Sequence, residues 1–89
     1  MKHINVKITG RVQGVWYRGS ARYEAMSLGL KGFVCNCPDG SVYLEAEGAE
    51  MALQSLIQWC HRGPELARVE KVEVEEGEWQ NFETFEVKR

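Results

Sequence analysis

The sequence is short of the features that mark membrane, secreted and nucleic-acid-binding proteins. No apolar run approaches the roughly 18 residues of a membrane-spanning helix, and no basic segment followed by an apolar one precedes the first strand. Eleven basic residues stand against 13 acidic ones, for a formal net charge of −2, whereas nucleic acids and anionic membranes attract basic surfaces. We therefore expect a cytoplasmic protein that binds neither nucleic acid nor a membrane.

Cysteine and proline are also scarce. Three cysteines, Cys35, Cys37 and Cys60, cannot all pair within one chain, and a C-x-C spacing with no second pair nearby is poor for zinc. We expect reduced thiols, no metal and no cofactor. The chain has two prolines and no repeat, linker or low-complexity stretch. Its 89 residues, 44% of them hydrophobic and 27% charged, fit one small globular domain over residues 1–89.

Two periodicities divide the chain into strands and helices. Apolar and polar residues alternate in segments that we predict to be strands: residues 3–9, 32–37, 41–47, 67–75 and 82–88. Apolar residues recur at helical spacing over residues 18–28 and 50–61, and a glycine follows each segment where a helix commonly ends. The alternation of the fourth strand changes parity between Val69 and Val72, which predicts a β-bulge near Glu70 or Lys71.

The order of these elements predicts an α+β fold. Pro38-Asp39-Gly40 is a sequence typical of a tight turn, and it joins the second and third strands into a hairpin. The two helices and the first four strand segments follow a β-α-β-β-α-β order, which predicts a ferredoxin-like sandwich: a four-stranded antiparallel sheet with two helices on one face. In that topology the third strand separates the first two. The loop after the first strand and the end of the second strand then face the same edge, so Arg18 and Asn36 can converge.

The loop between the first strand and the first helix carries the main functional signal. Residues 10–18 read Gly-Arg-Val-Gln-Gly-Val-Trp-Tyr-Arg. A glycine-bracketed turn directs several backbone N–H groups at one point, the helix N-terminus adds partial positive charge, and Arg18 adds a planar set of donors. Such a loop can hold a tetrahedral oxyanion, and phosphate is the first candidate. From spacing alone, an ordinary glycine turn with a surface arginine explains the segment equally well.

Two segments resemble the signatures of the acylphosphatase family. Residues 8–18 resemble the first signature, and residues 32–42, Gly-Phe-Val-Cys-Asn-Cys-Pro-Asp-Gly-Ser-Val, followed by Gly48, resemble the second. The two segments occur in the order and at the separation found in the family. Chain length and predicted topology also suit the family, so the resemblance extends over essentially the whole chain.

The resemblance implies a metal-independent enzyme without a cofactor. Its partner would be a small-molecule acyl phosphate, whose carboxyl–phosphate bond is hydrolysed to a carboxylate and inorganic phosphate. By motif position, Arg18 is the phosphate-binding arginine, and Asn36 positions the attacking water. The backbone amides expected around the phosphate are those of Gln13, Gly14, Val15, Trp16, Tyr17 and Arg18. A single acylphosphatase-like domain over residues 1–89 is implied, and the lack of an extra apolar face predicts a monomer.

Two positions depart from the family's usual pattern. Tyr17 stands where phenylalanine is more usual, and its hydroxyl needs a partner if it is buried. Cys35 stands where a basic residue is frequent.

Two other classes of protein share this order of elements. RNA-recognition modules do, but the acidic composition opposes that interpretation. Acylphosphatase-like domains also begin larger hydrogenase maturation factors. The presence of both Arg18 and Asn36 favours an enzyme over a regulatory domain.

Overall fold

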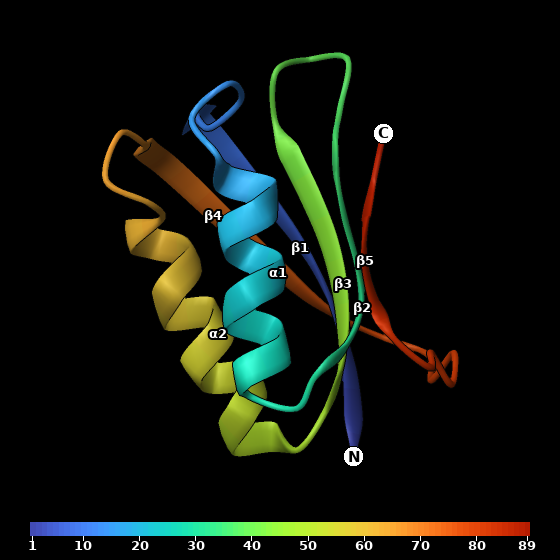
Figure 1. Cartoon of the computed structure of the whole chain (residues 1–89). Coiled ribbons are helices and arrows are strands. Elements are labelled where there is room, and N and C mark those ends of the chain that lie inside the picture. Colours follow the sequence, from blue (N-terminus) through green and yellow to red (C-terminus); the bar gives the residue numbers. More distant parts are fainter.

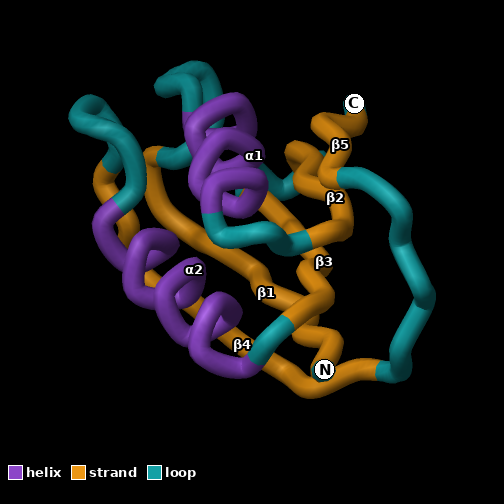
Figure 2. The backbone as a smooth tube through the Cα atoms, turned by 60° about the horizontal axis from the view of Figure 1, so that its bottom comes forward, coloured by secondary structure: helices purple, strands orange, loops and turns teal.

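The computed structural model describes residues 1–89 and contains two helices and five strands. In chain order these are β1 (Lys2–Arg11), α1 (Tyr17–Ser27), β2 (Lys31–Asn36), β3 (Val42–Gly48), α2 (Glu50–Arg62), β4 (Arg68–Gly77) and β5 (Phe85–Lys88). Both helices lie on the same face of the sheet (Figures 1 and 2). The predicted elements are all present, and the ferredoxin-like α+β fold class is confirmed.

The sheet differs from the predicted one in strand number and direction. Its five strands lie in the order β4-β1-β3-β2-β5, and β5 pairs with β2 in parallel, so the expectation of four purely antiparallel strands is wrong. The reason is visible in Figure 1, where the chain leaves β4 at the end of the sheet that holds the N-terminus. Residues 78–84 cross to the far edge at that end, where β2 begins, so β5 must run in the direction of β2.

Strand alternation places the apolar core between the sheet and the helices. Ile4, Val6 and Ile8 of β1 are buried beside Leu44 and Ala46 of β3, and the two helices cover them. Tyr17, Ala21, Ala25, Leu53, Leu56, Trp59 and Cys60 supply the helical side of this core. At roughly 25 cal/mol for each Å² of apolar surface removed from water, this layer dominates the stabilisation of the fold.

The predicted β-bulge is present in β4. Thr9 pairs with Lys71 while Gly10 pairs with Val69, which leaves Glu70 without a partner on β1. Gly10 has φ = 129°, and a Cβ there would lie 2.2 Å from the carbonyl oxygen of Arg68. The bulge therefore brings the two backbones too close for any residue but glycine. Beyond it, β1 ends and the chain turns toward α1.

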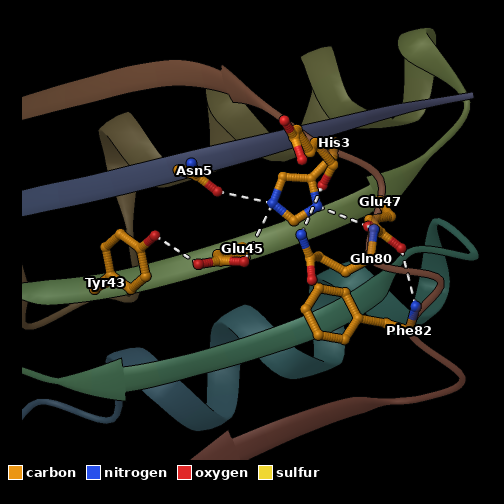
Figure 3. A network of polar contacts seen from close by, with 8 residues as sticks. His3, Asn5, Tyr43, Glu45, Glu47, Gln80 and Phe82 are labelled. Atoms are coloured by element: carbon orange, nitrogen blue, oxygen red, sulfur yellow. Dashed lines mark hydrogen bonds and ion pairs between the residues drawn. The ribbon is translucent and has the colours of Figure 1, made fainter.

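The opposite face of the sheet carries polar side chains, and residues 78–84 cover part of it. His3 and Glu47 are buried there, and Glu47 accepts hydrogen bonds from the His3 ring and from the backbone N–H groups of Gln80 and Phe82 (Figure 3). This contact attaches the crossing segment to the sheet. Neither helix is both long and apolar enough to cross a membrane.

Candidate active site

The loop between β1 and α1 has the conformation of an anion-binding turn. Gly14 and Trp16 both have left-handed backbones, with φ of 73° and 69°. No Cβ contact forbids a side chain at Gly14, so glycine is favoured there by its backbone conformation alone. Trp16 lies directly before α1, and its left-handed backbone conformation is sterically unfavourable for an L-residue. Residues with such conformations are concentrated at functional sites.

The backbone N–H groups of this loop have no partner in the rest of the backbone. No amide of residues 13–18 donates to a backbone carbonyl, and no side chain caps the start of α1. The first turn of a helix leaves N–H groups free and concentrates partial positive charge. The loop and the helix N-terminus therefore offer donors to an anion.

Three buried side chains hold the loop in place. Val12 and Val15 enter the apolar core, and the Tyr17 hydroxyl donates to the Cys60 carbonyl at 2.8 Å. The Cys60 carbonyl is therefore the hydrogen-bond partner that a buried Tyr17 hydroxyl was expected to need. Burial, together with the nearby Cys60, raises the pKa of Tyr17, so the phenol stays neutral.

Asn36 is the last residue of β2 and precedes a well-fixed turn. Its parity is that of Val34, which is fully buried, so its side chain points to the helix side of the sheet. The Asn36 Oδ1 atom is buried and has no hydrogen-bond partner within the protein. A buried polar atom without a partner is uncommon and calls for an explanation, such as a ligand or a catalytic role.

The turn after Asn36 is held by Asp39 and by the loop itself. The Asp39 carboxylate accepts hydrogen bonds from the Ser41 N–H and hydroxyl at 2.9 and 2.6 Å, and Lys7 lies 3.1 Å from its other oxygen. The hydrogen bonds from Ser41, followed by the contact with Lys7, hold the pKa of Asp39 well below its ordinary value. The carboxylate therefore keeps its charge and its turn geometry across the neutral range.

Gln13 connects the loop to this turn. Its side-chain Nε2 donates to the carbonyls of Cys37 and Ser41 at 2.8 and 2.9 Å. The sequence predicted only a backbone role for Gln13, and the structure adds this side-chain role. The two hydrogen bonds fix the spacing between the loop and Asn36.

Arg18 lies in the first turn of α1 and is held from the opposite side. Its Nη1 donates to the Lys88 carbonyl of β5 at 3.1 Å. One turn later, Arg22 Nε donates to the Phe85 carbonyl at 3.0 Å. The carbonyl edge of the last strand therefore orients the arginines of α1, and the remaining donors of the Arg18 guanidinium are available to an anion.

Arg18 and Asn36 line one cleft of about 370 Å³, at the end of the sheet where the β1–α1 loop and the β2–β3 turn lie (Figure 1). Its other lining residues are Val12, Gly14, Trp16, Tyr17, Gly19 and Val87. Of the six residues predicted to surround a phosphate, Gly14, Trp16, Tyr17 and Arg18 lie on the cleft wall. Gln13 and Val15 are not among the lining residues: one is bonded to the turn and the other is in the core.

Sequence reasoning missed Val87 and the Lys88 carbonyl. Val87 lines the cleft and the Lys88 carbonyl bonds Arg18 only because β5 pairs in parallel with β2, with Val34 opposite Val87 and Cys35 opposite Lys88. The alternation of Phe85 and Val87 was the only local signal in this strand. It predicted which face of the sheet each side chain occupies, but it could not predict that β2 is the neighbouring strand.

The cysteines lie apart from the cleft chemistry. Cys35 and Cys37 are half-buried and unpaired, and Cys60 is in the core. Burial, reinforced by the nearby Cys37, raises the pKa of the Cys35 thiol, which disfavours the reactive thiolate. No group of three or more His, Cys, Asp or Glu side chains is arranged to hold a metal ion.

A family model and the most similar relatives identify the family. A family model described as Acylphosphatase matches residues 4–87. An acylphosphatase of Methylococcus capsulatus is 51% identical over 86 residues, covering 92% of this chain and 94% of the relative. The structure of an acylphosphatase from Coxiella burnetii has a TM-score of 0.95 at 37% identity, covering 98% of this chain and 92% of that one. That of an acylphosphatase from Bacillus subtilis has a TM-score of 0.97 at 33% identity and covers both chains completely.

Proposed function

The chain belongs to the acylphosphatase family, hydrolases that act on acid anhydrides, and we propose that its catalysis takes place in the cleft between Arg18 and Asn36. The substrate is an acyl phosphate, and the products are a carboxylate and inorganic phosphate. One observation carries the location: Asn36, whose buried Oδ1 atom has no partner, lines the same cleft as residues of the β1–α1 loop whose amides have no backbone partner. The whole of residues 1–89 then forms a single catalytic unit.

The phosphate group is bound by the loop amides and by Arg18. In a loose phosphoryl-transfer transition state, charge spreads over the three equatorial oxygens of the transferring group. A set of fixed N–H donors and a guanidinium complements that charge without reorganising during the reaction. Support comes from the position of Gly14, Trp16, Tyr17 and Arg18 on the cleft wall and from the start of α1 at Tyr17.

Asn36 positions the attacking water. Its buried Oδ1 can accept a hydrogen bond from the water and direct an oxygen lone pair at phosphorus, in line with the bond that breaks. The P–O bond to the acyl oxygen then breaks, and its electron pair leaves with the carboxylate. Because a carboxylate is a good leaving group, no strong acid is needed.

A phosphate oxygen of the substrate accepts the proton that the water loses. An asparagine amide is too weak a base for this step, and the cleft wall contains no His, Asp, Glu or Lys. The reaction therefore rests on positioning and charge stabilisation. A pH–rate profile that requires a protein base near neutrality with several leaving groups would contradict this route.

The test is hydrolysis of benzoyl phosphate, with inhibition by inorganic phosphate measured in parallel. Asn36→Ala should lower kcat by roughly 10²–10³-fold, the typical effect of removing one preorganised polar group, while phosphate inhibition stays near the wild-type level. Arg18→Gln should weaken phosphate inhibition as well as turnover. Asn36→Ala with most of its activity intact would remove the water-positioning role.

A further inference from the structure

A second depression adjoins the candidate cleft along the exposed side of α1. Its volume is about 600 Å³, and Trp16, Gly19 and Val87 belong to the walls of both. The rest of its wall comes from α1: Arg22, Tyr23, Met26 and Ser27. We call this depression the α1 groove. Because the two cavities share three wall residues, a molecule bound in the cleft can extend directly into the groove.

The α1 groove is lined by large apolar side chains that face solvent. Their exposed fractions are 78% for Trp16, 75% for Tyr23, 52% for Met26 and 41% for Val87. Single exposed apolar residues are common, but a contiguous set beside the candidate cleft indicates a binding surface. Tyr and Trp supply contact area at a low entropic cost, and Met adapts to irregular shapes.

The boundary between cleft and groove depends on Gly19. A Cβ at this position would lie 2.9 Å from Cζ3 of the Trp16 ring, which is closer than side chains pack. The indole therefore lies directly against the backbone of α1 at the junction. Arg22, the one charged residue of the groove wall, is turned toward β5 by its hydrogen bond to the Phe85 carbonyl, so the groove stays predominantly apolar.

We propose that the α1 groove binds the acyl group of the substrate and favours acyl phosphates whose acyl group is aromatic or a long hydrocarbon chain. The inference rests on the proposed function, since the phosphate must occupy the adjoining cleft. In an acyl phosphate a single oxygen separates the carbonyl carbon from phosphorus. The acyl group of a phosphate held by the loop therefore lies close to the cleft, and the groove is the apolar surface that adjoins it. We expect a benzoyl ring to extend further toward Tyr23 and Met26 than a two-carbon acyl group does.

The experiment compares benzoyl phosphate with acetyl phosphate in wild type and in the double variant Tyr23→Ala/Met26→Ala. Both residues are exposed on α1, and neither belongs to the cleft wall. We expect kcat/KM for benzoyl phosphate to fall roughly tenfold and that for acetyl phosphate to change less than about twofold, because pocket contacts discriminate by such factors. The control is Met51→Ala/Leu66→Ala, which removes apolar side chains of similar exposure, 84% and 69%, away from the groove, and should change neither value.

Each result separates the two proposals. A wild-type protein that hydrolyses neither compound overturns the proposed function, and the groove inference falls with it. An active wild type whose double variant loses both activities equally, or neither, overturns the groove inference alone. Sedimentation of wild type and of the double variant tests whether a second copy of the chain occupies the groove instead. If the double variant alters only self-association and leaves selectivity intact, the groove is an interface between two copies and the inference is wrong.

Discussion

At the end of the sheet that holds the N-terminus, Glu47 accepts hydrogen bonds from His3 and from two backbone amides (Figure 3). At the opposite end, Asn36 Oδ1 is buried with no partner. Both side chains come from central strands, β3 and β2. The difference separates their roles: a buried polar group whose hydrogen bonds are complete stabilises the fold, whereas one left open beside free loop amides is available to substrate.

The same contrast extends to the surrounding groups. Both ring nitrogens of His3 face acceptors, with Glu47 at 2.7 Å on Nδ1 and Asn5 and Glu45 at 2.8 and 3.2 Å on Nε2. This arrangement favours the imidazolium, which donates from both nitrogens. Around Asn36, the loop and the turn are bonded to each other by Gln13 and leave the cleft-facing donors free.

The largest effect on stability should follow the loss of the Glu47 charge. Glu47→Gln keeps the shape but removes the negative charge and replaces one of the two acceptor oxygens with an NH2 donor. Either the Phe82 amide, or His3 together with the Gln80 amide, then faces a donor, and breaking such a buried pair costs about 3 kcal/mol or more. Urea unfolding measures the cost. The matched control is Glu45→Gln, because Glu45 also contacts His3 but is partly exposed, and it should cost less than about 1 kcal/mol. Equal costs for the two variants would contradict the contrast.

The pH dependence of stability should sharpen this contrast. Burial alone would lower the pKa of His3, but hydrogen bonds to Glu47 and Asn5 and the charges of Glu45 and Glu47 raise it above its ordinary value of 6.5. Burial alone would raise the pKa of Glu47, but its hydrogen bonds lower it below 4.5. The His3 contribution is complete below pH 6.5 and is lost as pH rises through the folded-state pKa. The Glu47 contribution is complete above pH 4.5 and is lost as pH falls through its own folded-state pKa.

Both contributions are therefore complete only between about pH 4.5 and 6.5. The unfolding free-energy difference between wild type and Glu47→Gln should be larger at about pH 5.5 than at about pH 8.5. Chemical unfolding at the two pH values measures it. A difference that grows toward alkaline pH would show that His3 is neutral in the folded protein.

The sequence predicted the end of the sheet that carries the cleft better than the other end. Arg18 and Asn36 could be placed together because they follow local patterns: a strand–glycine turn–helix and a hairpin. The bulge at Glu70 could likewise be predicted, because the alternation of apolar and polar residues changes parity between Val69 and Val72. Each of these features depends on neighbouring residues in the chain.

The features that sequence reasoning missed depend on distant pairing. His3 lies opposite Glu47 in the β1–β3 register, 44 residues away, and neither residue alone signals a buried ion pair. The amides of Gln80 and Phe82 belong to a segment with no strand or helix of its own. Val87 lines the cleft and the Lys88 carbonyl bonds Arg18 only through the parallel β2–β5 pairing. Alternation gives the face on which a residue lies, but not which strand lies beside it.

A smaller effect on stability is expected from the loss of the hydrogen bond that Tyr17, a residue of the cleft wall, donates to the protein backbone. Tyr17→Phe removes the donor to the Cys60 carbonyl and keeps the ring that lines the cleft, so it should cost about 1 kcal/mol of stability, typical of one neutral hydrogen bond. Benzoyl phosphate turnover should stay within about twofold of wild type, since the loop is also anchored by Val12 and Val15. Urea unfolding and a kinetic assay on the same sample separate the two. A large loss of turnover with unchanged stability would place the hydroxyl in the reaction.

The smallest effect on stability should come from Asn36→Ala, the variant expected to be most damaging to turnover. Its Oδ1 has no hydrogen bond to lose, and removing an unsatisfied buried polar atom relieves a desolvation cost, so the unfolding free energy should change by less than about 1 kcal/mol in either direction. The measurement is urea unfolding of Asn36→Ala beside Glu47→Gln. An Asn36→Ala protein as unstable as Glu47→Gln would mean that the amide holds the turn after β2 together. An inactive protein that is more stable than wild type would mean that stability at this end of the sheet is given up for function.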